Sequence, residues 1–286
     1  MRLSIGTAQF GFNYGITNFK GKVKINQIAK ILRFCKKNKL NNLDTAIGYG
    51  KSEKILGKFK LDNFLITTKL PEIPKSQKNN LHKWIENQVK SSCKRLKVKK
   101  IFCLLLHKPN QLKGKLGNQI IESVKKLKKD GVIKKFGVSV YSVKELNSII
   151  SNFKIDLVNI PLSIINRDFL KKNYLKFLKK KKIEIHVRSI FLQGLLLNFK
   201  DLKISNISKN NFFDRWGKWL SKKKISPLEA CLAFVKEIKE IDKIIVGIDN
   251  YEQLKDIFST YKSLKKTLIP NFVVNKKLKD PSKWIL

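Results

Sequence analysis

The stretch LNNLDTAIGYGKSEKILGKF, residues 40–59, joins a short apolar segment to a helical one through a glycine-rich turn. Residues 41–46 are typical of a brief buried strand, and residues 51–60 have the apolar spacing of a helix. Asp44 is therefore expected where the strand ends, and Tyr49 in the loop that follows. Glycines on both sides of the tyrosine leave its hydroxyl free to enter a cleft, although an ordinary surface turn is the alternative.

The next two predicted strands also end in side chains that can take part in chemistry. Residues 64–69 end at Lys69, and residues 101–106 are followed by His107. The chain has only three histidines but many lysines, so His107 is the more informative of the two. Because the carboxyl ends of parallel strands meet at one face, Asp44, Lys69 and His107 are expected to lie together, which weakens the surface-turn alternative.

Buried strands alternate with amphipathic helices along the chain. The strand-like segments are Leu3–Ala8, Asn42–Thr45, Phe64–Lys69, Ile101–Leu106, Lys135–Ser139, Asp156–Ile160, Ile183–Arg188 and Lys243–Gly247. The helical segments are Ile25–Asn38, Lys51–Lys60, Asn80–Leu96, Gln119–Asp130, Val143–Ser151, Asp168–Lys181, Pro227–Glu240 and Tyr251–Leu264. This alternation predicts parallel βαβ units, and eight of them predict a closed (β/α)₈ TIM barrel of the α/β class. An open doubly wound sheet is the alternative, but it usually carries a G-x-G-x-x-G motif, which is missing.

The composition favours a single domain over residues 1–286. Proline and glycine are sparse, at 7 and 14 residues, and no linker or internal repeat divides the chain. A long connection at residues 196–224 carries several aromatic side chains: Phe199, Phe212, Phe213, Trp216 and Trp219. We expect it either to form a lid over the site or to be held on the barrel rim by these aromatic side chains.

The charge is strongly positive, since 62 Lys and Arg residues against 21 Asp and Glu residues give a formal net charge of +41. Arg occurs only at positions 2, 33, 95, 167, 188 and 215, and the lysines are spread over almost every predicted helix. A nucleic-acid site would concentrate charge and favour Arg. We therefore expect a lysine-rich surface without a specific nucleic-acid partner, although a basic polyanion-binding protein is an alternative.

Sequence signals for membrane insertion, disulfides and metal binding are missing. No apolar run approaches the roughly 20 residues of a membrane helix, and residues 1–10 lead straight into a predicted strand. The four cysteines are far apart and fall on predicted core elements: Cys35, Cys93, Cys103 and Cys231. We expect reduced, buried thiols, a cytoplasmic location, and no metal site, because no His, Cys and carboxylate residues have zinc-like spacing.

The side chains at the strand ends suit transfer of a proton to a carbonyl oxygen. A tyrosine hydroxyl ordinarily has a pKa of ~10, so near neutrality it exchanges protons poorly unless a cation favours the phenolate. Lys69 could supply that cation, and Asp44 could hold Lys69 charged. A neutral His107 could donate a hydrogen bond to the same carbonyl oxygen, and together these groups would stabilise an alkoxide as hydride arrives.

The chain resembles the aldo-keto reductases from Leu3 to about Leu254. The motifs that carry the resemblance are IGTAQFG, LDTAIGYGKSEKILG, TTKL, LLLHKP, KKFGVSVYS, LVNIPLSIINR, RSIFLQGLL and VGIDNYEQL. The resemblance implies a catalytic tetrad of Asp44, Tyr49, Lys69 and His107. It also implies NADP(H) bound across the barrel mouth, with NAD(H) as the alternative, and a C-terminal tail at residues 270–286 that lines the substrate cleft.

The resemblance further implies a set of dinucleotide-binding residues: Ser139, Asn159, Arg188, Gln193, Gly194, Leu195, Gly247, Asp249, Asn250 and Gln253. Three positions depart from the usual pattern. Asn159 stands where Gln is usual, Arg188 stands where an aromatic ring usually stacks on the nicotinamide, and Asp249 lies where many NADP(H)-preferring relatives carry basic residues.

The resemblance therefore implies an NAD(P)(H)-dependent oxidoreductase that acts on an aldehyde, a ketone or the corresponding alcohol. The opening GTAQFG and the following YGITN resemble a bacterial group and favour a sugar-related or small aliphatic substrate. A regulatory protein of the same fold, which binds the dinucleotide with little turnover, is an alternative. The sequence does not predict the oligomeric state.

Overall fold

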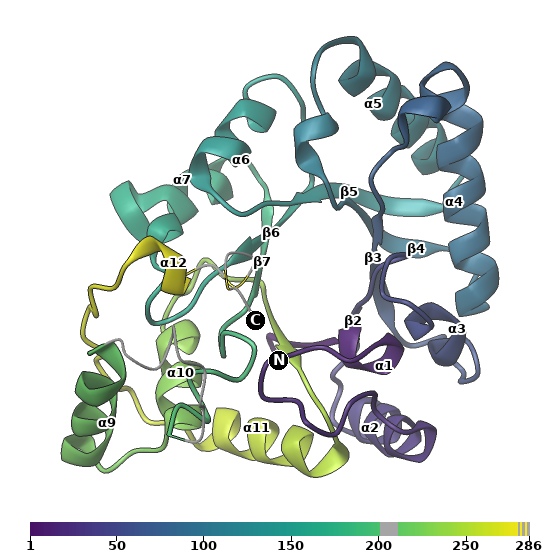
Figure 1. Cartoon of the computed structure of the whole chain (residues 1–286). Helices are drawn as coiled ribbons and strands as arrows, with labels where there is room; N and C mark the ends of the chain where they lie inside the picture. Colours follow the sequence, from purple (N-terminus) through teal and green to yellow (C-terminus); the bar gives the residue numbers. More distant parts are fainter. Residues whose placement is uncertain (201–210, 280, 282–283, 285–286) are drawn as a thin grey trace.

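The computed structural model describes residues 1–200, 211–279, 281 and 284. Within them eight strands form a closed, all-parallel barrel in sequence order, and β1 (Leu3–Gly6) pairs with β8 (Lys243–Gly247) to complete the ring (Figure 1). The strands between them are β2 (Asn42–Asp44), β3 (Leu65–Leu70), β4 (Ile101–Leu106), β5 (Ile133–Ser139), β6 (Leu157–Pro161) and β7 (Glu184–Arg188). The closed ring confirms the (β/α)₈ barrel and excludes the open sheet.

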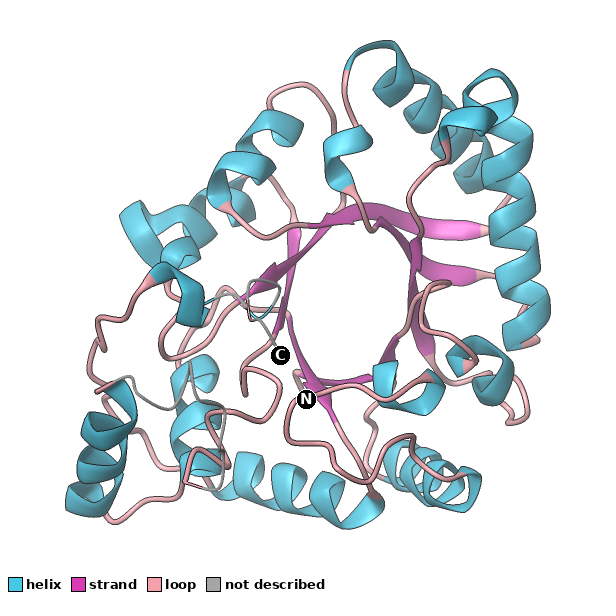
Figure 2. Cartoon of the chain, viewed as in Figure 1, coloured by secondary structure: helices cyan, strands magenta, loops and turns pink. Residues whose placement is uncertain are grey.

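The helices surround the barrel (Figure 2). Their buried apolar side chains belong to the same core as those of the strands. They are α2 (Ile25–Lys37), α3 (Ser52–Leu56), α4 (Leu81–Leu96), α5 (Gly114–Lys129), α6 (Val143–Ile150), α7 (Tyr174–Lys180), α10 (Pro227–Lys236) and α11 (Tyr251–Ser263). In α2, for example, Ile28, Ile31 and Cys35 are fully buried while the opposite face is rich in lysine. Burial of such apolar stripes against the strands supplies most of the stability of the helices.

The strand register brings the predicted site residues to one mouth of the barrel. Gly6 at the end of β1 pairs with Asp44 on one side and with Gly247 on the other. Ser139 at the end of β5 pairs with Asn159 on β6. Because all strands run in the same direction, their last residues lie around the same opening, where TIM barrels place their active sites.

Two predicted helices are shorter than expected for local reasons. The helix predicted at 51–60 ends at Leu56, because the chain passes so close to α4 that a Cβ on Gly57 would lie 2.0 Å from the carbonyl oxygen of Arg95. The helix predicted at 168–181 is interrupted, since Lys172 and Asn173 both have positive φ, at 51° and 54°. It becomes the 3₁₀ segment η3 (Asp168–Asn173) followed by α7.

Other boundaries also differ from the prediction. The short helix α1 (Ala8–Gly11) was not expected, α5 begins at Gly114 rather than Gln119, and α10 ends at Lys236 rather than Glu240. The remaining regular segments are η1 (Lys75–Asn80), η2 (Pro109–Gln111) and α12 (Lys276–Lys279).

The long connection at 196–224 contains a further helix, α9 (Phe212–Lys223), on the outer side of α10 (Figure 1). Trp216 is fully buried, stacks on Phe212 and Trp219, and donates a hydrogen bond from Nε1 to the carbonyl oxygen of Leu196 at 3.2 Å. Phe272 from the C-terminal tail packs edge-on against the same rings. The described aromatic side chains thus hold this connection in place, as in the expectation that they anchor it. Residues 201–210 lie outside the described part.

The described part of the tail beyond residue 264 packs on the segment that follows β6, where Asn166 donates a hydrogen bond to the carbonyl oxygen of Lys279. Arg167 donates hydrogen bonds to the carbonyl oxygens of Ile269 and Pro270, and Trp284 donates one to that of Lys277. Residues 280, 282–283 and 285–286 of the tail lie outside the described part.

Candidate active site

Lys69 and Asp44 form a buried ion pair at the centre of the barrel mouth. Lys69 Nζ donates to Asp44 Oδ1 at 2.5 Å and to the carbonyl oxygen of Thr45 at 2.8 Å. Their side chains are only 1% and 7% exposed, so each charge depends on the other for compensation. Burial lowers the pKa of Lys69, but the nearby Asp44 and Tyr49 outweigh burial and raise it above its usual value. Lys69 is therefore a permanent cation near neutral pH.

Tyr49 and His107 lie beside this cation. Lys69 Nζ is 4.8 Å from the centre of the Tyr49 ring. The rings of Tyr49 and His107 meet nearly edge to face, with centroids 6.1 Å apart and planes at 77°. On its other side the Tyr49 ring contacts Phe12, with centroids 5.9 Å apart. The structure thus brings the four predicted catalytic residues together.

Two glycines allow the Tyr49 turn to approach α1. A Cβ on Gly11 would lie 1.7 Å from the carbonyl oxygen of Tyr49, a distance that no side chain can adopt. Gly50 has φ of +54°, and a Cβ there would lie 2.8 Å from the carbonyl oxygen of Gly11. The turn that carries Tyr49 is therefore held by close backbone packing, and Ser52 Oγ adds a hydrogen bond to the carbonyl oxygen of Thr7 at 2.9 Å.

His107 is neutral at physiological pH. Burial lowers its pKa to about 4, and the positive charges of Lys69, Arg188 and Lys108 act in the same direction. A neutral imidazole carries one N–H donor and one acceptor nitrogen. His107 can therefore donate a hydrogen bond to a ligand oxygen without bringing a further positive charge.

A cavity of about 460 Å³ opens beside these residues. It runs from Asp44, Tyr49, Lys69 and His107 to the ends of β7 and β8. Seven of the predicted dinucleotide-binding residues line it: Ser139, Arg188, Gln193, Gly194, Gly247, Asp249 and Gln253.

The other three predicted residues do not line the cavity. Asn159 lies behind Asp44, with its Nδ2 donating to Asp44 Oδ2 at 3.4 Å, while its Oδ1 is buried without a partner. Leu195 is a core side chain, 1% exposed. Asn250 caps α11 by accepting a hydrogen bond from the backbone N–H of Gln253 at 2.9 Å. Direct ligand contact is thus less well supported for these three.

Arg188 is the last residue of β7 and lines the cavity. Its guanidinium carbon lies 4.4 Å from the centre of the Tyr141 ring. The guanidinium donates to the carbonyl oxygen of Val140 at 3.2 Å and to Ser189 Oγ at 3.3 Å. One face of the guanidinium plane is therefore covered by an aromatic ring of this chain.

At the other end of the cavity, the start of α11 is capped by side chains of this chain. Gln27 Oε1 accepts from the backbone N–H of Tyr251 at 3.0 Å, and Gln253 Oε1 accepts from that of Asp249 at 2.7 Å. Burial raises the pKa of Asp249, while hydrogen bonds from Gln253 and Gln9 and the charge of Lys20 oppose that rise. Oδ1 of Asp249 is buried and has no partner.

These features fit an elongated ligand that spans the barrel mouth. The cavity has a reactive end at Lys69 and a second end at the start of a 13-residue helix. The side chain of Gln9 lies directly on Gly247, where a Cβ would come within 2.6 Å of Gln9 Nε2. The unpaired Oδ1 of Asp249 suits a ligand with a hydrogen-bond donor, whereas the space beside Gly247 is filled by Gln9 of the same chain.

Several cavity residues were missed by the sequence reasoning. Gln9, Phe12, Tyr14 and Thr17 come from the segment after β1, and Tyr141 from the segment after β5. The rule that barrel sites are built from the segments after each strand could have found them.

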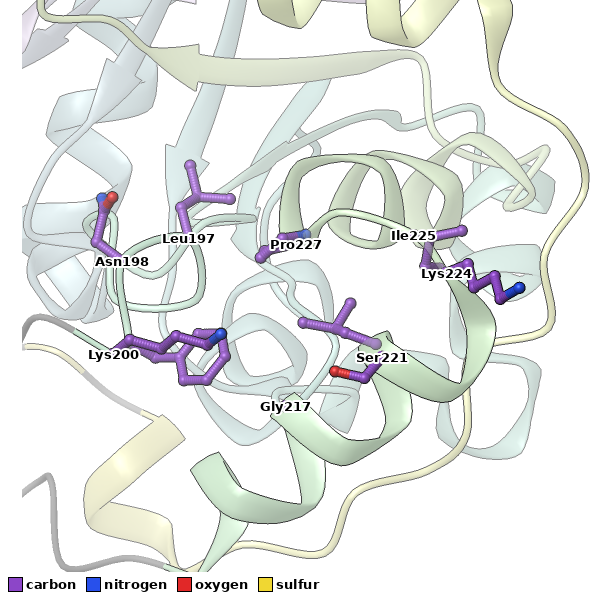
Figure 3. Close-up of a pocket in the computed structure, with 10 residues that line it drawn as sticks. Leu197, Asn198, Lys200, Gly217, Ser221, Lys224, Ile225 and Pro227 are labelled. Carbon is purple, nitrogen blue, oxygen red and sulfur yellow. The ribbon is translucent and has the colours of Figure 1, made fainter.

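A second cavity of about 400 Å³ lies between α9 and the segment that follows β7 (Figure 3). Ser221 and Gly217 of α9 face Leu197 and Pro227 across it. Leu197 and Asn198 also line the first cavity, so the two cavities share a wall.

Within the described part of the chain, no group of three or more His, Cys, Asp or Glu side chains could hold a metal ion. In the same residues no helix has the length and apolar character needed to cross a membrane. The cysteines are unpaired thiols, and burial raises the pKa of Cys35 to about 12.

Solved structures of similar fold cover nearly the whole chain. An aldo-keto reductase from Bacillus halodurans in its holo form is 18% identical, with a TM-score of 0.70, and the match covers 97% of this chain and 89% of that one. A putative aldo-keto reductase from Pseudomonas aeruginosa is 20% identical, with a TM-score of 0.67, over 92% of this chain and 91% of that one. At these identities the likeness supports the fold.

Sequence comparisons identify the family. A D-arabinose 1-dehydrogenase from Saccharomyces cerevisiae is 28% identical over 121 residues, which is 40% of this chain but only 36% of that protein. The model of the Aldo/keto reductase family matches residues 2–268. The chain therefore belongs to the aldo/keto reductase family, whose members are NAD(P)-dependent oxidoreductases.

Proposed function

We propose that this protein transfers hydride between a nicotinamide dinucleotide and an aldehyde or ketone, or the corresponding alcohol. The observation that carries the proposal is the buried pair of Lys69 and Asp44 beside the ring of Tyr49. A lysine held charged at this position favours the phenolate that a tyrosine becomes when it gives up its proton. His107, neutral and edge-on to the same ring, supplies a hydrogen-bond donor.

Each residue has a distinct role in reduction. The dinucleotide, when bound, supplies the hydride that the carbonyl carbon gains. Tyr49 donates a proton to the carbonyl oxygen, so that the product is an alcohol. Lys69 stabilises the negative charge left on Tyr49, and Asp44 holds Lys69 in place. His107 orients the carbonyl oxygen toward Tyr49 by a hydrogen bond. Oxidation of an alcohol reverses these roles.

Seven cavity-lining residues are proposed to contact the dinucleotide: Ser139, Arg188, Gln193, Gly194, Gly247, Asp249 and Gln253. Leu195 and Asn250 would support it from the core and from the helix cap. Asn159 would orient Asp44 rather than contact the ligand. The acid at Asp249 and the side-chain caps on α11 weigh against the NADP(H) preference predicted from resemblance, because an additional phosphate needs cations or free N–H donors.

The partial likeness to a D-arabinose 1-dehydrogenase supports the prediction of a sugar-related substrate. The size of the cavity, about 460 Å³, suits part of a dinucleotide together with a small carbonyl compound. The cytoplasmic location expected from the sequence stays a prediction.

The test is a titration of the purified protein with NADH and with NADPH, followed by tryptophan fluorescence and calorimetry. Turnover is then measured on a panel of small aldehydes and sugars by the loss of dinucleotide absorbance. Micromolar or tighter binding together with turnover supports the proposal. Binding with no turnover on any carbonyl would favour the regulatory alternative, and no binding of either dinucleotide would contradict both.

A further inference from the structure

Glu53 is a buried carboxylate that the proposed reaction does not use. It is the second residue of α3, four residues after Tyr49, and its side chain is only 2% exposed. Among the described residues, Asp44 is the other buried carboxylate. Glu53 does not line the cavity. A buried carboxylate is costly unless it is paired and hydrogen-bonded, so Glu53 depends on the partners that surround it.

The partners of Glu53 come from two other elements. Thr68 Oγ1 on β3 donates to Oε1 of Glu53 at 2.7 Å, and Ser92 Oγ on α4 donates to the same oxygen at 2.6 Å. Arg95 of α4 donates from Nε to Oε2 at 2.8 Å, and its Nη2 lies 2.7 Å from that oxygen. Thr68 and Ser92 are fully buried. Glu53 therefore joins α3 both to β3 and to α4.

The contact with β3 is made by the residue next to Lys69. Successive side chains of a strand point to opposite faces. Lys69 points into the barrel mouth, where it pairs with Asp44. Thr68 accordingly points away from the mouth, where it meets Glu53. The carboxylate of Glu53 thus holds β3 directly beside the catalytic cation, from the other face of the strand.

The residue before Glu53 fixes the segment of Tyr49 on a second side. Ser52 is fully buried, and its Oγ donates to the carbonyl oxygen of Thr7 at 2.9 Å. The same Oγ lies 3.0 Å from Thr7 Oγ1 and 3.2 Å from Thr45 Oγ1. The backbone N–H of Ser52 donates to the carbonyl oxygen of Tyr49 at 3.0 Å. The segment of Tyr49 is therefore bound to the ends of β1 and β2 by Ser52 and to β3 by Glu53.

Stability alone does not account for a charged group at this place. Replacement of a buried ion pair by apolar side chains of similar volume is often neutral or stabilising. Hydrogen bonds, unlike apolar contacts, fix both a distance and a direction. Such precision matters here, because the ring of Tyr49 lies 4.8 Å from Lys69 Nζ and a misplacement of about 1 Å can cost about 100-fold in rate.

We propose that Glu53 is a positioning residue that holds the segment of Tyr49 against β3 and so sets the approach of Tyr49 to Lys69. The contact that does this is the hydrogen bond from Thr68, whereas the hydrogen bond from Ser92 joins Glu53 to α4. This inference rests on the proton transfer proposed above for Tyr49. The competing role is structural only, in which Glu53 stabilises the fold through all of its partners alike.

The test compares two matched deletions of a hydroxyl. Glu53→Ala is unsuitable, because it would leave Arg95 without its partner and mix a loss of stability with a change of position. Thr68→Val and Ser92→Ala each remove one buried hydroxyl that donates to the same oxygen of Glu53. Thr68→Ser keeps the hydroxyl on β3. The wild type and the three variants are compared for kcat, KM, dinucleotide affinity and the free energy of unfolding in urea.

Thr68→Val is expected to lower kcat by roughly 10- to 100-fold, the effect of a misplaced catalytic group. The KM for the carbonyl compound and the dinucleotide affinity should change only a few-fold. Ser92→Ala should keep kcat within a few-fold of the wild type, although its loss of stability should be comparable, because each variant loses one buried hydrogen bond. Thr68→Ser should have nearly the kcat of the wild type.

Crystal structures of Thr68→Val and Ser92→Ala give a measure that does not depend on turnover. The distance between Lys69 Nζ and the centre of the Tyr49 ring should increase in Thr68→Val and stay near 4.8 Å in Ser92→Ala. Failure of the proposed function would appear as no turnover of any compound by the wild type. The distance would still test the positioning role in that case.

Four results would overturn the inference. They are equal losses of kcat in Thr68→Val and Ser92→Ala, wild-type kcat in Thr68→Val, no recovery of kcat in Thr68→Ser, or an unchanged distance from Lys69 to Tyr49 in Thr68→Val. The first of these would assign Glu53 the structural role alone.

Discussion

The charge of Lys69 has both a structural and a chemical role, and the two can be separated. Lys69→Met leaves Asp44 buried and unpaired, so we expect the free energy of unfolding to fall by about 3–5 kcal/mol. Lys69→Met combined with Asp44→Leu removes both charges and should recover most of that loss, as measured by urea denaturation. Turnover should stay absent in both proteins. Recovery of turnover in the double variant would contradict the role of the cation.

The lowered pKa of His107 predicts a specific dependence of stability on pH. The unfolded chain takes up a proton on this residue near the usual pKa of ~6.5, whereas the folded protein does so only near about 4. Stability is therefore complete above the unfolded value and is lost as the pH falls toward the folded value. From about pH 7 to pH 5 the loss from His107 is expected to be at most about 2 kcal/mol.

His107→Gln isolates this contribution, because every other titrating group remains. Urea denaturation at both pH values should show a smaller fall in the free energy of unfolding for the variant than for the wild type. An equal fall in the two proteins would show that His107 does not resist protonation.

The sequence could predict that the four proposed catalytic residues lie together, because a barrel brings strand ends together and Asp44, Lys69 and His107 lie at strand ends. Tyr49 followed from its glycine neighbours. The position of Asn159 behind Asp44 could not be predicted, since it depends on how far apart β2 and β6 lie across the barrel. The contact of Arg188 with the Tyr141 ring likewise could not be predicted. It depends on the turn that begins at Ser189, which has a left-handed backbone although it is not a glycine.

At the scale of elements, the segment after β1 and the segment after β7 meet over the cavity. Gly194 has φ of +88°, and a Cβ there would lie 1.9 Å from Thr17 Oγ1. Thr17 Oγ1 also donates to the carbonyl oxygen of Gln193 at 3.3 Å. We expect Gly194→Ala to separate the two segments and to weaken dinucleotide binding by roughly 10-fold, a cost of about 1.4 kcal/mol.

Gly131→Ala is the matched control, because Gly131 also has positive φ, at +69°, but nothing lies within 4 Å of its Cβ position. Gly131→Ala should lower the free energy of unfolding by about 1 kcal/mol, because alanine is strained at a positive φ. It should leave dinucleotide affinity unchanged. Calorimetric titration of both variants gives the comparison. Equal affinities in the two would mean that contact between these segments does not shape the binding site.

The types of most barrel elements were predictable, whereas their irregularities were not. Strands and helices can be predicted from the spacing of apolar residues, which is visible within a short stretch of sequence. The break at Lys172 and Asn173 has no glycine or proline to mark it. Helix α9 was expected only as part of a long connection. Two of its buried aromatic side chains, Phe212 and Trp216, pack against Phe272 of a tail that is distant in sequence.

At the scale of the whole molecule, the net charge of +41 predicts attraction to polyanions without specificity. Binding to a DNA fragment should be measurable at about 50 mM salt and should fall by orders of magnitude by about 200 mM, because each neutralised phosphate releases counterions. Fluorescence anisotropy over a salt series checks this. Tight binding that survives the higher salt would favour the polyanion-binding alternative.

Tyr49 is the residue proposed to exchange the proton in the hydride-transfer reaction. The most direct measurement is turnover of the purified protein and of Tyr49→Phe on a carbonyl compound that the wild type reduces, with dinucleotide affinity measured alongside. Tyr261→Phe, which removes the same hydroxyl from the buried face of α11, is the control. We predict that Tyr49→Phe lowers kcat by about 10²- to 10⁴-fold with unchanged dinucleotide affinity, while the control keeps wild-type turnover. Turnover of Tyr49→Phe within a few-fold of the wild type would contradict the claim.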